Sequence, residues 1–276
     1  MNAPILLHRP ASQGHVPMMV MPPAGAARDA SATMSELLRL MGADEGEARL
    51  ATGLTVSMRR LRAGQALFHE GAPAESIYFV RSGTFKIFHT AEDGYEQVLG
   101  FVGRAEVLGF DAVCTQGHPT EAAALEDSSV FALPMHELFA LAERSAALAR
   151  VVHLAVSSAL ARQGELADVM AAVAAEVRLA RFLLHLSQRM AAAGQSPRRF
   201  VLRMSRRDIA SYLAVAHETV SRSFTALVNW DLAKVDNRDV DIVDMDGLRS
   251  LARSTRRQID EAGRQCLSHA TVAHAA

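Results

Sequence analysis

The sequence predicts an α+β fold in which a small β domain of jelly-roll type precedes a mainly helical C-terminal half. Short β-rich runs separated by glycine-containing turns fill residues 54–135. A stretch without proline and with helical apolar periodicity follows over 136–171. Residues 172–262 alternate helical patterns with one Val- and Asp-rich stretch (232–243) that is typical of a hairpin.

Length and composition exclude several classes of protein. The chain has 276 residues, of which 50% are hydrophobic and 21% charged, enough for a packed core in about two domains. Its two cysteines, Cys114 and Cys266, exclude a disulfide framework, a zinc site built on paired Cys-x-x-Cys units and a cluster held by four local cysteines. No apolar run reaches the ~18 residues of a membrane span, and no secretory pattern opens the chain. We expect a reduced, soluble, cytoplasmic protein with no membrane partner.

The N-terminal residues are rich in Ala, Pro and Met, and their prolines interrupt any helix, which predicts a flexible arm. The alternative is a soft metal site made by His8, His15, Met18, Met19 and Met21. A helix is expected over 34–52, ahead of the β-rich runs. The expected segments are an arm (1–33), a β domain (34–135), one long helix (136–171), a helical domain with a hairpin (172–262) and a loose tail (263–276).

The long helix carries a seam of residues at alternating three- and four-residue spacing, which is typical of a helix that pairs with another helix. A second copy of the chain is the simplest partner; packing within one chain is the alternative. A neighbouring frame through Val152, Ala155 and Ala159 fits nearly as well. Gln163 keeps a charge off the seam, so we expect a dimer that forms without an effector. The seam residues are His153, Val156, Leu160, Gln163, Ala167 and Met170.

The densest pattern lies at residues 204–222 and predicts two short helices joined by a tight turn. Ser205 is suited to cap the first helix, and Asp208 completes the acidic half of a capping box. Ile209 and Leu213 form an apolar pair one turn apart, and a short break follows at 215–216. This arrangement predicts a helix-turn-helix.

The second of these helices has an inner and an outer face. Val220, Phe224 and Leu227 are expected to face inward, which leaves four polar residues outside: His217, Glu218, Ser221 and Arg222. Arg can donate twice to guanine, Glu can accept from cytosine, and Ser can bond either way or touch a thymine methyl. Residues 197–234 carry a net charge of +4 in a chain of net charge −1, as phosphate binding requires. The alternative is an ordinary helical hairpin with a solvated basic face.

On these residues the sequence resembles Crp/Fnr-family transcription regulators, and within them the FNR branch, over about residues 35–262. The most specific part is 218–222 (ETVSR), supported by 77–86 and 106–112 in the β segment. The resemblance implies a cyclic-nucleotide-binding-like β-roll, a dimerisation helix and a C-terminal winged helix-turn-helix. It also implies a homodimer on double-stranded DNA at a TTGAT-N4-ATCAA inverted repeat, acting as an activator in an anaerobic, redox or nitrogen-oxide response.

The resemblance further assigns roles to single residues. Base reading falls to His217, Glu218, Ser221 and Arg222. Phosphate contacts fall to Ser205, Arg206, Arg207 and Thr219, together with the wing. A contact with RNA polymerase falls to Gly109, Phe110 and Asp111.

The sequence also departs from the family's patterns. Residues 1–50 contain no cysteine, and Phe131 stands at the β-roll cysteine position, so we expect no iron–sulfur cluster. Residues 110–111 and 118–120 stand where a cyclic nucleotide would be held; no arginine is present there, so we expect no cAMP binding. In the C-terminal motif, Ala214 stands where glycine is common, and Ser223 where an apolar residue is usual.

The signal and the competing functions remain open from the sequence. Haem or another metal has three candidate ligands, His118, His136 and His153, against the alternative that each is an ordinary surface or core residue. A cupin-type metalloenzyme would need a His-x-His pair, which residues 54–135 do not contain. A ligand-binding β-roll without a DNA role is the other alternative. We expect a regulator and not an enzyme.

Overall fold

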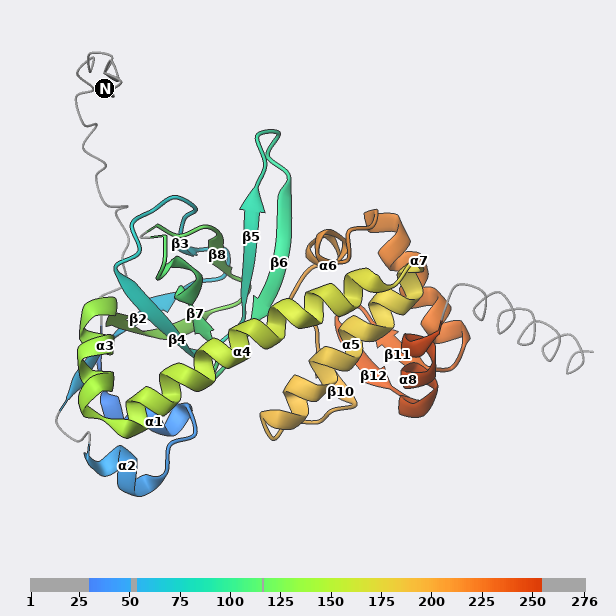
Figure 1. Ribbon diagram of the computed structural model, residues 1–276. Helices are drawn as coiled ribbons and strands as arrows, with labels where there is room; N and C mark the ends of the chain where they lie inside the picture. Colours follow the sequence, from blue (N-terminus) through green and yellow to red (C-terminus); the bar gives the residue numbers. More distant parts are fainter. Residues whose placement is uncertain (1–29, 51–53, 116, 255–276) are drawn as a thin grey trace, which may run out of the picture.

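The computed structural model describes residues 30–50, 54–115 and 117–254. A two-sheet β-roll lies at one end, a helical domain at the other, and one long helix runs between them (Figure 1). This is the predicted α+β fold, with the β domain first. Within the described ranges, no helix is both long and apolar enough to cross a membrane.

The β-roll is built from two antiparallel sheets. One has the strand order β1-β2-β9-β4-β7 and the other β3-β8-β5-β6. β9 pairs with both β2 and β4 and is buried along nearly its whole length, as a central strand requires. The bounds are β1 (Ala30–Thr33), β2 (Thr55–Leu61), β3 (Ala66–Phe68), β4 (Ser76–Ser82), β5 (Phe85–Thr90), β6 (Glu96–Val102), β7 (Val107–Leu108), η1 (Phe110–Ala112), β8 (Glu121–Ala124) and β9 (Ser128–Pro134).

Two expectations for the N-terminal segment are corrected. The arm was expected to reach residue 33, but Ala30–Thr33 pairs with β2 as a sheet edge; residues 1–29 lie outside the described residues. The helix expected over 34–52 is two helices, α1 (Met34–Leu40) and α2 (Glu45–Leu50), because Gly42 between them has φ +81°. A capping box of Thr33 and Glu36 starts α1.

The single helix expected over 136–171 is also two helices, α3 (Met135–Arg144) and α4 (Ala146–Ala171). Ser145 between them is extended, and its hydroxyl accepts a hydrogen bond from Leu148 N at 3.3 Å. A serine that caps the next helix competes with continuation of the preceding one. Of these two helices, α4 is the one that runs from the β-roll to the C-terminal domain, over about 39 Å at 1.5 Å per residue (Figure 1).

The predicted seam of α4 lies on its uncovered side. Leu160 is 64% exposed, Val156 is 39% exposed, and His153, Gln163 and Ala167 are exposed as well. Met170 is partly buried. Ala155 of the neighbouring frame is instead buried with Val151 against the β-roll and α1. The chain therefore buries Ala155 of the second frame and leaves the first frame exposed apart from Met170, which packs against the C-terminal core.

The C-terminal domain packs four helices on a three-stranded sheet of order β10-β12-β11. Its core contains Leu183, Ile209, Phe224 and Ile242. The predicted hairpin is present, and the last helix is described to residue 253. The bounds are α5 (Ala175–Ala192), β10 (Arg199–Val201), α6 (Arg206–Leu213), α7 (His217–Asn229), β11 (Ala233–Asp236), β12 (Asp239–Ile242) and α8 (Met245–Arg253). The tail expected over 263–276 lies outside the described residues.

The β5–β6 hairpin of the β-roll is attached to α6 of the C-terminal domain. Ser211 Oγ accepts from Val98 N at 2.8 Å and donates to Glu96 O at 2.6 Å. Lys86 Nζ lies 3.3 Å from Asp208 Oδ1. Tyr212 packs beside Phe101 and Phe182, and burial raises the pKa of its hydroxyl to about 12. These contacts join the two domains.

Candidate DNA-binding interface

The capping box predicted at the start of α6 is present. Ser205 Oγ accepts from Asp208 N at 3.1 Å, and Asp208 Oδ2 accepts from Ser205 N at 2.9 Å. Two backbone N–H groups at the helix N-terminus are satisfied in this way. Asp208 also faces Lys86 of the β-roll, so one carboxylate both begins α6 and attaches it to the other domain.

The turn between α6 and α7 has the geometry of a helix-turn-helix although it lacks glycine. Ala214 adopts the left-handed conformation, φ +50° and ψ +50°, and Val215 N donates to Ala210 O at 3.1 Å. An L-residue in this conformation costs about 1–2 kcal/mol. Glycine is common at this position in the family, and the structure shows that the turn is kept despite the alanine.

The two faces of α7 are arranged as predicted. Val220, Phe224 and Leu227 are buried in the domain core. Ser223 is buried too, and its Oγ lies 3.5 Å from Glu176 Oε1 of α5, which accounts for a polar residue at that position. The outer face exposes four side chains, which we call the outer stripe: His217, Glu218, Ser221 and Arg222.

The outer stripe is free of side-chain partners in the described residues. Ser221 Oγ reaches only the carbonyl of His217 on the same helix, at 3.5 Å. Buried polar groups in proteins are paired, whereas an exposed row of donors and acceptors at one helix face is available to a partner. Arg222 supplies a bidentate donor and Glu218 an acceptor on this face, the chemistry that distinguishes base edges in a major groove.

The residues with expected phosphate contacts are not all placed alike. Arg207 is exposed, whereas Ser205 and Thr219 are half-buried. The guanidinium of Arg206 instead lies over the Phe224 ring, with Cζ 3.5 Å from the ring centroid. Burial lowers the pKa of Arg206. The structure therefore turns one of the two adjacent arginines into the domain and leaves the other outside.

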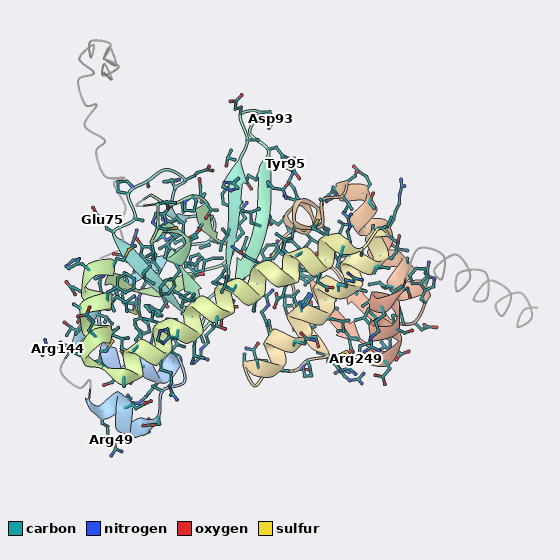
Figure 2. All side chains as sticks on the ribbon, viewed as in Figure 1. Arg49, Glu75, Asp93, Tyr95, Arg144 and Arg249 are labelled. Carbon is teal, nitrogen blue, oxygen red and sulfur yellow. The ribbon has the colours of Figure 1, made fainter. Side chains whose placement is uncertain are left out.

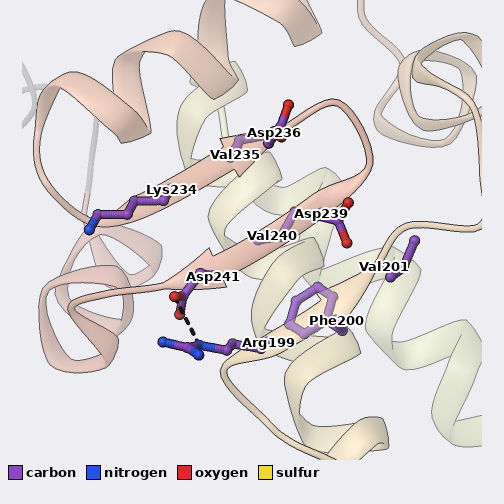
Figure 3. Close-up of a pocket in the computed structure, with 9 residues that line it drawn as sticks. All are labelled: Arg199, Phe200, Val201, Lys234, Val235, Asp236, Asp239, Val240 and Asp241. Atoms are coloured by element: carbon purple, nitrogen blue, oxygen red, sulfur yellow. Dashed lines mark ion pairs between the residues drawn. The ribbon is translucent and has the colours of Figure 1, made fainter.

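We define the wing as the β11–β12 hairpin (233–242). The net charge of +4 was counted over residues 197–234, and the part of the wing that follows Lys234 adds three aspartates. The outer face of the sheet forms an open hollow of about 400 Å³ where Arg199 Nε pairs with Asp241 Oδ2 at 3.0 Å (Figure 3). Its acidic lining residues are Asp236, Asp239 and Asp241. The basic group at the tip of the wing is Arg238, which is exposed and which sequence reasoning did not single out.

In the β-roll, the loop after β7 is closed on itself. His118 is 2% exposed, and its ring stacks on Phe68 with centroids 3.7 Å apart. Burial lowers the pKa of this imidazole. Thr120 Oγ1 donates to Asp111 Oδ2 at 3.1 Å. The Nδ1 atom of His118 is buried and has no hydrogen-bond partner among the described residues.

The other candidates of the β-roll are dispersed. Gly109 is left-handed at φ +92° and begins η1, Phe110 packs against the core, and the Asp111 residue is exposed. His136 and His153 are both exposed and lie on different helices, α3 and α4. Among the described residues, no three His, Cys, Asp or Glu side chains converge as metal ligands.

Comparisons with known proteins match both domains. A profile described as "Cyclic nucleotide-binding domain" matches residues 58–145, and one described as "Crp-like helix-turn-helix domain" matches residues 177–251. "Transcriptional regulatory protein btr" of Bordetella pertussis is 32% identical over 226 residues, which are 82% of this chain and 93% of that protein. The chain belongs to the Crp/Fnr family. It is a DNA-binding transcription regulator and not an enzyme.

Further relatives include two named regulators of similar identity. "Transcriptional activator protein Anr" of Pseudomonas protegens is 37% identical over 70% of this chain and 80% of its own length. The "Fumarate and nitrate reduction regulatory protein" of Salmonella typhimurium is 35% identical over 71% of this chain and 78% of its own. The structure of FixK2 from Bradyrhizobium japonicum has a TM-score of 0.65 at 27% identity and covers 73% of this chain and 100% of that one.

Proposed function

We propose that two copies of this regulator bind a TTGAT-N4-ATCAA inverted repeat and activate transcription in an anaerobic, redox or nitrogen-oxide response. The observation that carries the proposal is the outer stripe of α7, whose Glu218, Ser221 and Arg222 are exposed and unpaired above a packed inner face. Arg222 and Glu218 read the G·C pair of each half-site, and Ser221 approaches a thymine. Arg207 and the wing-tip Arg238 hold phosphates.

The dimer is supported by the uncovered seam of α4. Leu160 and Val156 keep apolar surface in water in a single chain, and burial of such surface drives helix association. Pairing through α4 spaces two α7 helices for half-sites about one DNA turn apart, ~34 Å. Sedimentation at micromolar concentration without effector is expected to give a dimer, and Leu160→Glu to give a monomer. Leu154→Glu is the matched control, because Leu154 is exposed beside the seam; dissociation by the control alone would contradict this register.

We propose further that DNA binding needs neither an iron–sulfur cluster nor cAMP. The chain has two cysteines, too few for a four-cysteine cluster. The region where the family holds a cyclic nucleotide contains the stacked ring of His118, and Thr120 is bonded to Asp111. A cyclic phosphate needs a cationic donor there, so these residues do not fit that ligand. A haem site with two His ligands is also disfavoured, because His136 and His153 are separately exposed.

The test is a gel-shift titration of aerobically purified protein without added ligand, at one stated salt concentration. Three duplexes carry a TTGAT-N4-ATCAA site, a TGTGA-type site and a scrambled site. Tight binding to the first alone is expected. Equal, weak binding to all three would contradict the FNR-type reading and the independence from an effector.

For activation we propose that η1 contacts RNA polymerase through Asp111, which is exposed, whereas Gly109 is buried and Phe110 is half-buried. Asp111→Ala is then expected to lower transcription in vitro from a promoter with the inverted repeat and to leave DNA affinity unchanged. Unchanged transcription would remove this surface from the proposal. A cytoplasmic location follows from the same role, because the DNA target lies there.

A further inference from the structure

Arg206 occupies an unusual position for an arginine beside a DNA-reading helix. It is the first residue of α6, and its side chain lies between α7 and the wing. Its Cζ is 3.5 Å from the Phe224 ring centroid, and its Nη2 donates to the backbone oxygen of Asn237 at 2.8 Å. Its Nη1 is buried and has no hydrogen-bond partner among the described residues. The guanidinium of this α6 residue therefore contacts two other elements of the domain, α7 and the turn of the wing.

The carbonyl that Arg206 holds belongs to the tip of the wing. Asn237 has φ +51°, and it forms the two-residue turn between β11 and β12 together with Arg238. Leu202 N also donates to Arg238 O, at 2.8 Å. The segment around the start of α6 thus ties both residues of the turn by their carbonyl groups. The Arg238 side chain is left exposed on this fixed turn.

The contacts of Arg206 are of a kind that is lost if the side chain moves out to a phosphate. A guanidinium stacked on an aromatic face and donating to a carbonyl uses its planar geometry, which an ammonium group cannot reproduce. Arg207, the next residue, is exposed and has no such contacts in the described residues. The two adjacent arginines therefore differ in environment: Arg206 is bound within the domain, and Arg207 is exposed.

We propose that Arg206 is a positioning residue, which locks the wing tip to the recognition helix so that Arg238 and the outer stripe of α7 meet the same duplex. This deepens the proposed function and rests on it for the DNA part. It also revises the expectation that Arg206 contacts a phosphate: Arg206 acts through Arg238, and Arg207 contacts DNA itself.

The first experiment compares lysine and alanine variants at the two positions, by binding titrations on the TTGAT-N4-ATCAA duplex at several salt concentrations. A phosphate contact survives as a lysine, whereas a planar stack does not. We expect R206K to bind as weakly as R206A, about tenfold below wild type, and R207K to stay near wild type. R207A should reduce the salt slope by about one unit. Near-wild-type binding by R206K beside a weak R206A would overturn the proposal.

The second experiment asks whether Arg206 acts through the wing tip. If it does, R238A adds little to R206A, because the misplaced wing has already lost that phosphate contact. R207A and R238A serve as the control pair and should be additive, since both side chains are exposed and separate. Additive losses for R206A and R238A would contradict action through Arg238.

The third experiment needs no DNA and separates this proposal from the proposed function. Amide hydrogen exchange of the wing, residues 233–242, is expected to be faster in R206A and in R206K than in wild type, and unchanged in R207A. F224L should act like R206A, because it removes the ring under the guanidinium. Unchanged wing exchange in R206A would overturn the positioning role, whatever the DNA result. Failure of the wild type to select any duplex would instead count against the proposed function and leave the exchange result to decide on wing locking.

Discussion

In the β-roll the side chains of the family's ligand region are packed inside the chain, where the buried Nδ1 of His118 has no hydrogen-bond partner among the described residues, whereas on α7 the corresponding polar side chains are exposed. His118 is 2% exposed and stacked on Phe68, and Thr120 is bonded to Asp111. Glu218, Ser221 and Arg222 are exposed and, among the described residues, pair with no other side chain; Ser221 Oγ lies 3.5 Å from the carbonyl of His217 on the same helix. The difference is one of access: the donors and acceptors of α7 can be satisfied by water or a partner, whereas the unpaired Nδ1 of His118 is buried and carries a desolvation cost.

The largest expected effect is on DNA affinity, after a substitution in the outer stripe of α7. Arg222→Glu replaces a bidentate donor with a charge that repels phosphate, so specific DNA affinity should fall by about 100-fold or more. Titration by gel shift at constant salt measures this. Arg249→Glu on α8 is the matched control: Arg249, which is labelled in Figure 2, is exposed, and its ion-pair partner among the described residues is Asp246 of the same helix. Equal losses in both variants would mean that net charge alone governs binding.

For the buried side chains after β7 in the β-roll, we expect an effect on stability instead. His118→Ala removes a buried stacked ring and should lower the free energy of unfolding by about 2 kcal/mol or more, with DNA affinity unchanged under folding conditions. Denaturant unfolding followed by the fluorescence of the single tryptophan gives the measurement. A variant that gains affinity for cAMP or that keeps full stability would show that the region is not closed by this ring.

The same histidine predicts a pH dependence. Burial holds the pKa of His118 below its unfolded value of about 6.5, so the unfolded chain binds more protons near that pH. The stabilisation is therefore complete above about pH 6.5 and is lost as the pH falls through the folded pKa. His118→Phe keeps an aromatic ring without a titrating group. Between pH 7.5 and 5.5, the free energy of unfolding should fall less in this variant than in wild type. Parallel plots of unfolding free energy against pH would contradict this.

A smaller effect is expected where the two domains meet, between β6 and α6. Ser211→Ala leaves Val98 N without the hydroxyl that accepts its hydrogen bond, a loss of about 1–2 kcal/mol in unfolding free energy. Ser221→Ala, on the exposed stripe, should change stability by less than about 0.5 kcal/mol. Urea midpoints of the two variants measure the contrast. A neutral Ser211→Ala would show that water replaces the hydroxyl and that the junction is open.

The smallest effect is expected at the turn of the helix-turn-helix. Ala214→Gly relieves a left-handed alanine at φ +50° and should raise stability by about 1 kcal/mol. Ala226→Gly in the middle of α7 should instead lower it by about 1 kcal/mol. Thermal unfolding of both variants gives the opposite signs expected. A loss on Ala214→Gly would show that the alanine methyl packs favourably enough to offset its backbone strain.

Much of the C-terminal motif could be predicted because its determinants are local. The capping box of Ser205 and Asp208 and the inward Val220, Phe224 and Leu227 depend on spacing within one or two helical turns, which the sequence displays directly. The break at Ser145 is also local, but a serine in an apolar-periodic stretch does not announce whether it caps a helix or lies inside one. The N-terminal strand Ala30–Thr33 shows no such pattern, because it is a short edge strand that pairs with β2 alone among the described strands.

The sequence by itself determined the fold class, the family and the outer stripe of α7, since periodicity, caps and turn residues act over a few neighbours. Only the tertiary structure decided which polar side chains bind other segments of the chain and which stay exposed to a partner. Arg206 and Arg207 are adjacent residues of the same type, and the sequence does not distinguish their roles. In the structure, the guanidinium of Arg206 contacts Phe224 and Asn237, whereas Arg207 is exposed. Likewise Ser211 is an ordinary helical serine until β6 lies against it. Such partners come from distant segments, and their contacts exist only once the core has folded and excluded water.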